Sequence, residues 1–307
     1  MRMPESGLKN TLWAEDGRGG LSGITRERIE LFRKRHMTEE ATVSLCCGAM
    51  LENPYLASGP LSIGYFGVNY DQALNIRTQL ALGAIYKFSG GPSTKRPFLG
   101  NASINYLCEQ GIRTIIGYER KDEFYNGFGL LQDIQSDSVF ISLTAPVSHK
   151  TTLDGLYRFL RYTDHNFLNM GVIGWKRMLT DNPCNLNIAA QLEYRNTEKP
   201  DIFIYNAAGN IIDIIHPYWC PQQYCAWRGW LEWNHNLSTF DFWGSQKHYY
   251  TIRVSGFSDS EHNPGASTFL EWHLDWDKSW SVQASGYLHY SVQWKAVGYW
   301  LSIGRHF

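Results

Sequence analysis

The sequence predicts an all-β fold, an antiparallel up-and-down transmembrane β-barrel of about 16 strands. Three observations support this prediction. Apolar and polar residues alternate with a period of two along many segments, turn signals separate those segments, and aromatic residues are unusually abundant. A strand with one apolar face repeats every two residues whereas a helix repeats about every 3.6, so the alternation favours strands.

Alternation is already present in the first two thirds of the chain. The segment from Thr25 to Arg35 is the one competing helix, but its apolar residues do not keep a helical period, and we interpret it as a strand. Two clearer runs follow it. Their apolar faces consist of Val139, Ile141, Leu143 and Ala145, and of Leu186, Ile188, Ala190, Leu192 and Tyr194.

The last third of the chain contains four consecutive alternating segments. With the intervening turn signals, such as Asn263-Pro264-Gly265, they extend the pattern to roughly 15 to 17 candidate strands of about 9 to 13 residues in meander order. The four apolar faces are Tyr250, Ile252 and Val254; Leu270, Trp272, Leu274 and Trp276; Val282, Ala284, Gly286, Leu288 and Tyr290; and Val297, Tyr299, Leu301, Ile303 and Phe307.

Composition limits the class of protein. Hydrophobic residues are 43% and charged residues 19% of the 307 residues, which predicts a folded chain. A net charge of -1 provides no basic field for nucleic acid, so we expect no nucleic-acid partner. No apolar run is long enough for a membrane-spanning helix. The first seven residues lack the apolar stretch of a signal peptide, so we expect either a cytosolic protein or a fragment whose export signal lies upstream.

The aromatic content distinguishes between two β architectures. A soluble sandwich or propeller buries its apolar faces, whereas a membrane barrel turns them toward lipid and needs aromatic girdles at both rims. Aromatic residues are 15% of the chain, with 18 Tyr and 12 Trp. We therefore predict a barrel in the bacterial outer membrane, surrounded by its lipid. The alternative is that the aromatic residues fill a sandwich core.

The C-terminus adds a second sign of a membrane barrel. The chain stops on Phe307, and the final segment resembles the terminal strand of bacterial outer-membrane barrels, whose last aromatic residue is read by the barrel-insertion machinery. The resemblance makes Phe307, Ile303, Leu301 and Tyr299 the assembly signal. Arg305 departs from the apolar face, but a long side chain at the periplasmic rim can extend to water.

Two segments resemble a narrower family. Tyr157 to Asn166 resembles the strand-plus-turn pattern of barrels that export exopolysaccharide. His216 to Tyr224, followed by Trp230 to His235, resembles a Tyr-x-x-Pro, strand, Glu-Trp segment of the same exporters, and residues 111–119 and 124–128 add a weaker likeness. Residues 110–307 thus resemble the C-terminal barrel of tetratricopeptide-linked cellulose and poly-N-acetylglucosamine export porins.

The resemblance implies a function and partners. In that family a barrel of about 16 strands follows a periplasmic helical-repeat region and passes a growing polysaccharide to the cell surface during biofilm or capsule formation. Residues 1–307 would then be a single barrel domain, a fragment without the signal peptide and repeat region. The expected partners are the exopolysaccharide chain and the periplasmic helical-repeat region or polysaccharide synthase complex.

The faces opposite the apolar ones would line the lumen. Aromatic rings stack on sugar rings and carboxylates bond sugar hydroxyls, so a mixture of the two suits a neutral or weakly charged sugar chain. The alternative is a ladder of charges that only stabilises the wall. The lumen candidates are Arg228, Trp230, Glu232, Arg253, Glu271, His273, Asp275, Glu193 and Arg195.

An enzyme is the less favoured interpretation. Glu271 and Asp275 would lie roughly 13 Å apart on one strand, too far for a hydrolase pair. The sequence contains no phosphate-binding loop, nucleophile elbow or zinc-type cysteine motif, so we expect no cofactor and no metal. Two alternatives to export stay open: a general porin or structural outer-membrane protein, and a barrel-borne hydrolase.

Six cysteines are more than a typical barrel contains. Cys46 and Cys47 are adjacent and would point to opposite faces of a strand. Cys220 and Cys225 could close a loop disulfide in an oxidising compartment. The alternative is a set of unbridged, small apolar residues.

Overall fold

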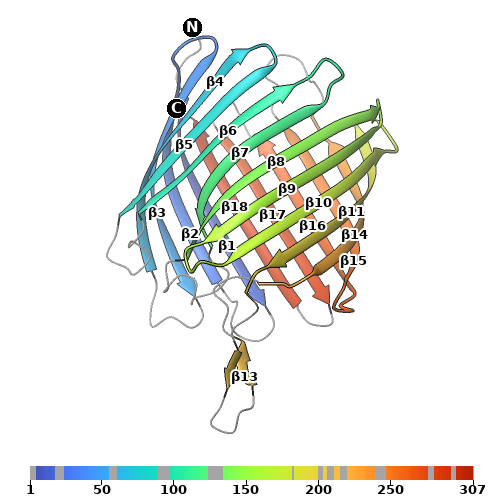
Figure 1. Ribbon diagram of the computed structural model, residues 1–307. Helices are drawn as coiled ribbons and strands as arrows, with labels where there is room; N and C mark the ends of the chain where they lie inside the picture. Colours follow the sequence, from blue (N-terminus) through green and yellow to red (C-terminus); the bar gives the residue numbers. More distant parts are fainter. Residues whose placement is uncertain are drawn as a thin grey trace.

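The computed structural model describes residues 5–17, 24–54, 61–88, 97–123, 134–181, 183–199, 203–205, 211–214, 220–238, 247–275, 280–291 and 295–306. Within these ranges, sixteen strands form a closed antiparallel barrel and two more form a separate small sheet (Figure 1). The barrel strands are β1 (Glu5–Gly17), β2 (Ile24–His36), β3 (Ala41–Pro54), β4 (Leu61–Asn75), β5 (Thr78–Phe88), β6 (Phe98–Leu107), β7 (Arg113–Asp122), β8 (Gln135–Ser148), β9 (Thr151–Tyr162), β10 (Phe167–Met178), β11 (Cys184–Thr197), β14 (Tyr224–Asn236), β15 (His248–Asp259), β16 (Gly265–Asp275), β17 (Trp280–Ser291) and β18 (Lys295–His306). The small sheet is β12 (Phe203–Tyr205) and β13 (Ile211–Ile214).

The barrel is a meander, as the sequence predicts. Each barrel strand pairs with its neighbours along the chain, and β1 pairs with β18 to close the ring. Within the described strands the one departure is that β11 pairs with β14, because β12 and β13 form a hairpin in the intervening connection. The all-β fold of about 16 strands is confirmed. The segment from Thr25 to Arg35 lies in β2, so its interpretation as a strand is also confirmed.

The described residues contain no helix that is long and apolar enough to cross a membrane.

The two ends of the barrel differ in their connections. Both chain termini lie at one end, where β4 and β5 are joined through residues 76–77 and β8 and β9 through residues 149–150 (Figure 1). The other end carries the connections 89–97, 123–134 and 198–223, and the β12–β13 hairpin projects from it (Figure 1). Outer-membrane barrels have short periplasmic turns and longer extracellular loops. We therefore call these the periplasmic end and the surface end.

The apolar faces predicted from alternation are the outer faces of the barrel. Along β14, Leu231 is 51% exposed, and Val254 and Leu270 on the next two strands are 54% and 51% exposed. Aromatic side chains occupy the same outer surface near strand ends. Tyr86 and Phe98 lie 5.0 Å apart at the surface end. This pair matches the aromatic side chains expected at the rim of a barrel in lipid.

Arg305 has an aromatic partner at the periplasmic end. Its guanidinium lies 5.1 Å from the ring centroid of Trp280 on the neighbouring strand. A cation over an indole at the rim keeps its charge near water while its stem covers apolar surface. This contact explains how an arginine is accommodated on the outer face.

On the inner face, large aromatic side chains lean over glycines of the adjacent strand. A methyl group built on Gly265 would lie 2.1 Å from the Phe257 ring, and one on Gly298 would lie 2.1 Å from the Tyr287 ring. Gly117 and Phe140 repeat the arrangement at 2.5 Å. Glycine is needed here because any Cβ would displace the ring.

Ion pairs on the inner face connect strands that are not direct neighbours. Lys176 on β10 reaches Glu232 on β14 at 2.8 Å across β11, where Ala189 is 2% exposed. Arg158 on β9 reaches Glu119 on β7 at 2.8 Å across β8, where Ser138 is 1% exposed. A small residue on the middle strand makes room for both partners. These pairs tie the wall together across three strands at a time.

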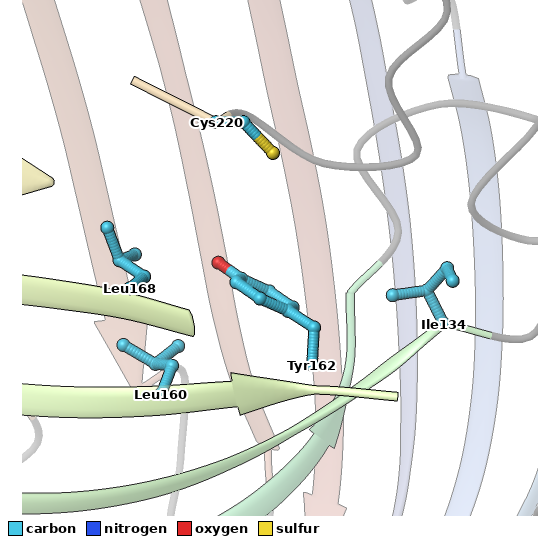
Figure 2. Close-up of a cluster of buried hydrophobic side chains, with 5 residues drawn as sticks. All are labelled: Ile134, Leu160, Tyr162, Leu168 and Cys220. Atoms are coloured by element: carbon cyan, nitrogen blue, oxygen red, sulfur yellow. The ribbon is translucent and has the colours of Figure 1, made fainter. Parts of the chain in front are cut away.

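At the surface end, part of the β11–β14 connection packs inside the barrel. Cys220 is buried against inner-face residues of β9 and β10, as Figure 2 shows. The carbonyl of Pro221 accepts hydrogen bonds from the backbone N–H and Oγ1 of Thr197, at 2.9 and 2.8 Å. The buried cluster consists of Ile134, Leu160, Tyr162, Leu168 and Cys220.

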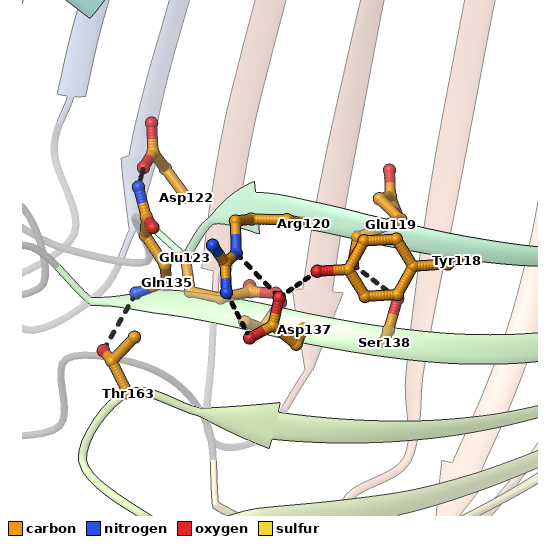
Figure 3. Close-up of polar contacts among 10 residues, drawn as sticks. Tyr118, Glu119, Arg120, Asp122, Glu123, Gln135, Asp137, Ser138 and Thr163 are labelled. Carbon is orange, nitrogen blue, oxygen red and sulfur yellow. Dashed lines mark hydrogen bonds and ion pairs between the residues drawn. The ribbon is translucent and has the colours of Figure 1, made fainter. Parts of the chain in front are cut away.

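Polar contacts hold the surface ends of β7 and β8 together (Figure 3). On the outer face Arg120 binds both carboxylate oxygens of Asp137 at 2.7 and 2.8 Å, and Tyr118 donates to the same carboxylate. The Nε2 of Gln135, a buried residue, donates to Asp122 at 3.0 Å. This end of the wall therefore combines an exposed ion pair with buried hydrogen bonds.

Candidate lumen site

The nine lumen candidates lie on the inner faces of four adjacent strands. Glu193 and Arg195 are on β11, the Arg228–Trp230–Glu232 group is on β14, Arg253 is on β15, and the Glu271–His273–Asp275 group is on β16. The strand registers place them on one side of the sheet, since Glu232 is opposite Arg253 and Arg228 is opposite Phe257. The structure thus gathers all nine on one stretch of wall, from the surface end to the periplasmic end.

Glu232 is at the centre of this wall and is held by two cations. Its Oε1 accepts from Lys176 Nζ at 2.8 Å, and its Oε2 accepts from Arg253 Nε at 2.9 Å. The Glu232 side chain is only 9% exposed, whereas those of Lys176 and Arg253 are 40% and 44% exposed. The carboxylate therefore has little surface left for a ligand. For this one residue, that fits the alternative of a ladder of charges that only stabilises the wall.

Lys176 was not among the residues chosen from the sequence. It lies on β10, two strands from β14, and a sequence pattern does not show which distant strands become second neighbours. Lys176 meets Glu232 because β10 and β14 both pair with β11.

Two of the three arginines among these candidates lie over aromatic rings. Arg253 Cζ is 5.8 Å from the ring centroid of Trp230 and 5.7 Å from that of Phe269, and Arg228 Cζ is 5.7 Å from that of Phe257. The indole Nε1 of Trp230 is buried and has no hydrogen-bond partner among the described residues. Cation–π contact thus orients the guanidinium groups along the wall.

Further rings extend this surface across β14 to β18. Phe269 and Tyr287 lie 5.9 and 6.3 Å from Trp300, and Phe257 stacks on His289 at 4.8 Å. Alternation in the sequence already places Tyr287 and Trp300 on the polar face of their strands, so the same pattern could have identified both as lumen residues. We call these inner-face rings the aromatic track: Trp230, Tyr249, Phe257, Phe269, His273, Tyr287, His289 and Trp300.

The periplasmic end of the track carries two carboxylates with partners. Tyr249 donates to Glu271 at 3.1 Å and stacks on His273 at 5.1 Å, with an angle of 14° between the ring planes. His273 Nε2 and Asp275 Oδ1 are 2.9 Å apart. Among the described residues, no group of three or more His, Cys, Asp or Glu side chains is arranged to hold a metal ion.

At the surface end, Glu193 and Arg195 form an ion pair with each other. Tyr224, opposite Arg195 in register, donates to Asp259 at 3.2 Å. The charges of the inner wall are therefore compensated locally at the centre of the track and at its surface end.

The disulfide between Cys220 and Cys225 is not formed. Cys225 is an exposed thiol on the outer face of β14, whereas Cys220 is buried inside the barrel mouth. The Nδ2 of Asn166 lies 3.5 Å from the Cys220 sulfur. The two sulfurs lie on opposite sides of the wall, which a spacing of five residues in the sequence does not reveal.

The described part of the predicted assembly signal faces outward. Tyr299, Leu301 and Ile303 are 51%, 40% and 40% exposed on β18. Phe307 lies outside the described residues, as do residues 216–219 of the second resembling segment.

Comparison with known proteins gives a likeness in structure only. No protein-family model and no curated protein matches the sequence. The structure is similar to a bacterial polysaccharide outer membrane secretin, with 10% identity, 98% of each chain covered and a TM-score of 0.69. It is also similar to OpdO of Pseudomonas aeruginosa, with 11% identity, 99% of this chain and 96% of that chain covered and a TM-score of 0.54. OccD1 (OprD) gives 8% identity, coverage of 100% and 96%, and a TM-score of 0.52.

These likenesses establish the fold, an outer-membrane β-barrel. The broad apolar outer surface of the closed ring requires lipid around it, because a soluble protein rarely exposes so much contiguous apolar area. The fold and this surface together place the barrel in a bacterial outer membrane, as the sequence predicts. Polar, charged and aromatic side chains line its inner wall, as in a general outer-membrane channel.

Proposed function

We propose that this barrel is an outer-membrane conduit through which an exopolysaccharide passes to the cell surface. The observation that carries the proposal is the aromatic track on the inner faces of β14 to β18. A channel for ions or small solutes has no need for groups of partly exposed rings spread along its wall. A sugar polymer does, because each pyranose ring presents C–H groups that pack on the electron-rich face of an aromatic ring.

The charges beside the track support weak, repeated contacts. Glu232 is bound by both Lys176 and Arg253, so its charge is compensated, and the rings around Trp230 provide stacking surface beside these ion pairs. Conduction requires sites that are favourable enough to enter and weak enough to leave. Many similar rings along the wall meet this requirement for a long polysaccharide.

The comparisons and the sequence resemblance give further support. One structural neighbour is described as a polysaccharide outer membrane secretin. Residues 110–307 resemble the barrels of tetratricopeptide-linked cellulose and poly-N-acetylglucosamine exporters. On this proposal the partners are the polymer and a periplasmic helical-repeat region or synthase complex, and the protein is a passive pore.

The experiment compares two rings of the aromatic track with one tryptophan on the outer face. The purified barrel is reconstituted in planar lipid bilayers, and blockade of its ion current by added oligosaccharides is measured for Trp230→Ala and Phe269→Ala. The matched control is Trp227→Ala, since Trp227 lies on the outer face of β14 and is 57% exposed. We expect blockade to weaken for the two track variants and to be unchanged for the control. If oligosaccharides never block the current, the conduit proposal fails.

The main alternative is a general porin. The fold likeness to OpdO and OccD1 is compatible with it. A general porin would conduct ions and small solutes equally well with and without Trp230 and Phe269, and oligosaccharide length would affect blockade only through size.

A further inference from the structure

Two asparagines on another part of the inner wall lean over one glycine. Asn69 on β4, Gly83 on β5 and Asn101 on β6 lie side by side in register. A methyl group built on Gly83 would lie 2.1 Å from Oδ1 of Asn101 and 2.7 Å from Oδ1 of Asn69. Both amides therefore occupy the space that the missing side chain leaves.

These positions face the lumen. On β5 the residues of opposite parity point outward, and Leu82 and Tyr86 are 40% and 44% exposed on the apolar outer surface. Leu82 and Tyr86 are even-numbered positions and Gly83 is an odd-numbered one, so Gly83 lies on the opposite, inner face of β5. Its two partners in register belong to the same face.

The two amides are not bonded to the side chains around them in the described part of the wall. Among the described residues, no side-chain hydrogen bond joins Asn69 or Asn101 to another group. The two Oδ1 atoms lie on either side of this position and so less than about 5 Å apart, close enough for one donor on the lumen side, such as a hydroxyl group, to reach both. Each amide also carries an NH₂ group that a hydroxyl oxygen can accept from. The pair is therefore suited to sugar hydroxyls.

The ring order places this amide pair opposite the aromatic track. In the described ring of sixteen strands, β4, β5 and β6 are each eight places from β14, β15 and β16. The two surfaces therefore face each other across the lumen.

The carboxylate opposite Asn101 is compensated. Glu119 is opposite Asn101 in register, and Arg158 binds its carboxylate at 2.8 Å. On the facing wall Glu232 is bound by Lys176 and Arg253. The carboxylates Glu119 and Glu232 are thus bound within the wall, and a passing chain would meet rings on one side and amides on the other.

We propose that Asn69 and Asn101 form a subsite for the hydroxyl groups of an uncharged polysaccharide, on the wall opposite the aromatic track. This inference rests on the proposed conduit function. It adds the class of polymer and the residues that make its polar contact.

The test uses the reconstituted full chain and three oligosaccharides of equal length. These are a neutral cello-oligosaccharide, an anionic oligogalacturonate and a cationic oligoglucosamine. We expect the neutral oligosaccharide to block the current of the unmodified protein best. The double variant Asn69→Ala/Asn101→Ala should weaken that blockade about tenfold, through loss of two hydrogen bonds. The matched control is Asn169→Ala, because Asn169 is on the outer face and binds Tyr157.

A second variant guards against a purely structural effect. Asn69→Asp places a negative charge at the subsite, and we expect it to weaken blockade by the neutral sugar and to strengthen blockade by the cationic one. A gain of this kind cannot result from misfolding.

The outcomes separate the inference from the function on which it rests. If neutral sugars block the unmodified channel and block the double variant equally well, the amide subsite is wrong and the conduit stands. If a charged oligosaccharide blocks more strongly than the neutral one, the uncharged class is wrong and the conduit again stands. If none of the three blocks, the proposed function itself fails.

Discussion

The two faces of β14 show how this barrel sorts its side chains. The outer face carries Trp227, Leu231 and Trp233, which are 57%, 51% and 38% exposed. The inner face carries Arg228 and Glu232, alternating with them along the same strand. The outer residues carry no charge, while the inner charges have partners or aromatic neighbours. Alternate residues of one strand thus face different environments, lipid on one side and the lumen on the other.

The largest expected effect comes from placing a charge on the outer face. Leu231→Arg should lower the free energy of unfolding by about 2–4 kcal/mol if the site lies near the bilayer midplane. Leu231→Ala is the control for lost volume and should cost less. Urea titration of the barrel in lipid vesicles measures both, and equal stability of the arginine variant and the parent protein would contradict the face assignment.

On the inner face the effect of losing a charge should be smaller. Glu232→Ala leaves Lys176 and Arg253 without their shared carboxylate, which costs about 1–3 kcal/mol when such groups stay buried. Both cations are already 40% or more exposed, so we expect the lower part of that range. The double variant Glu232→Ala/Arg253→Met should recover part of the loss in the same titration. A loss of stability as large as that of Leu231→Arg would show that the contacts of Glu232 with Lys176 and Arg253 stabilise more of the barrel than their immediate surroundings.

The exposed ion pair at the surface rim should matter still less. Arg120 and Asp137 are 43% and 32% exposed, and pairs of this kind contribute about 0–1 kcal/mol. Arg120→Ala should therefore change the unfolding midpoint little. A shift comparable to that of Glu232→Ala would mean that the rim pair is shielded from water.

The end of the chain should affect kinetics and leave equilibrium stability unchanged. Changing Phe307 to Ser should slow insertion into outer membranes, because the insertion machinery would lose its recognition signal. Pulse-chase measurement of heat-modifiable barrel gives the rate, with Tyr299→Ser as the comparison inside the same strand. Normal assembly kinetics would remove Phe307 from the predicted signal.

The cysteines provide a test that should leave stability unaffected. Cys225 should react at once with a maleimide that reaches the outer surface, and Cys220 should react only after unfolding. Mass spectrometry of the labelled protein without prior reduction reports both. Protection of both thiols until reduction would restore the disulfide.

The alternation of residues along the chain determined most of the fold. It identified the outward faces of β15 to β18, because a period of two is a local property that each strand carries by itself. It also assigned Arg228, Trp230, Glu232 and the other lumen candidates to one side of the sheet. Composition and aromatic content then indicated a membrane barrel, since only lipid requires apolar faces on the outside.

Only the tertiary structure decided which inner residues meet. The contact of Lys176 with Glu232, the convergence of Asn69 and Asn101 over Gly83, and the separation of Cys220 from Cys225 all depend on strand register or on the folding back of a long connection. Strand order and register are properties of the whole sheet, which includes the pairing of β1 with β18, almost the whole chain apart. A local pattern specifies which face a side chain occupies, but its neighbours on that face are set by the closed sheet.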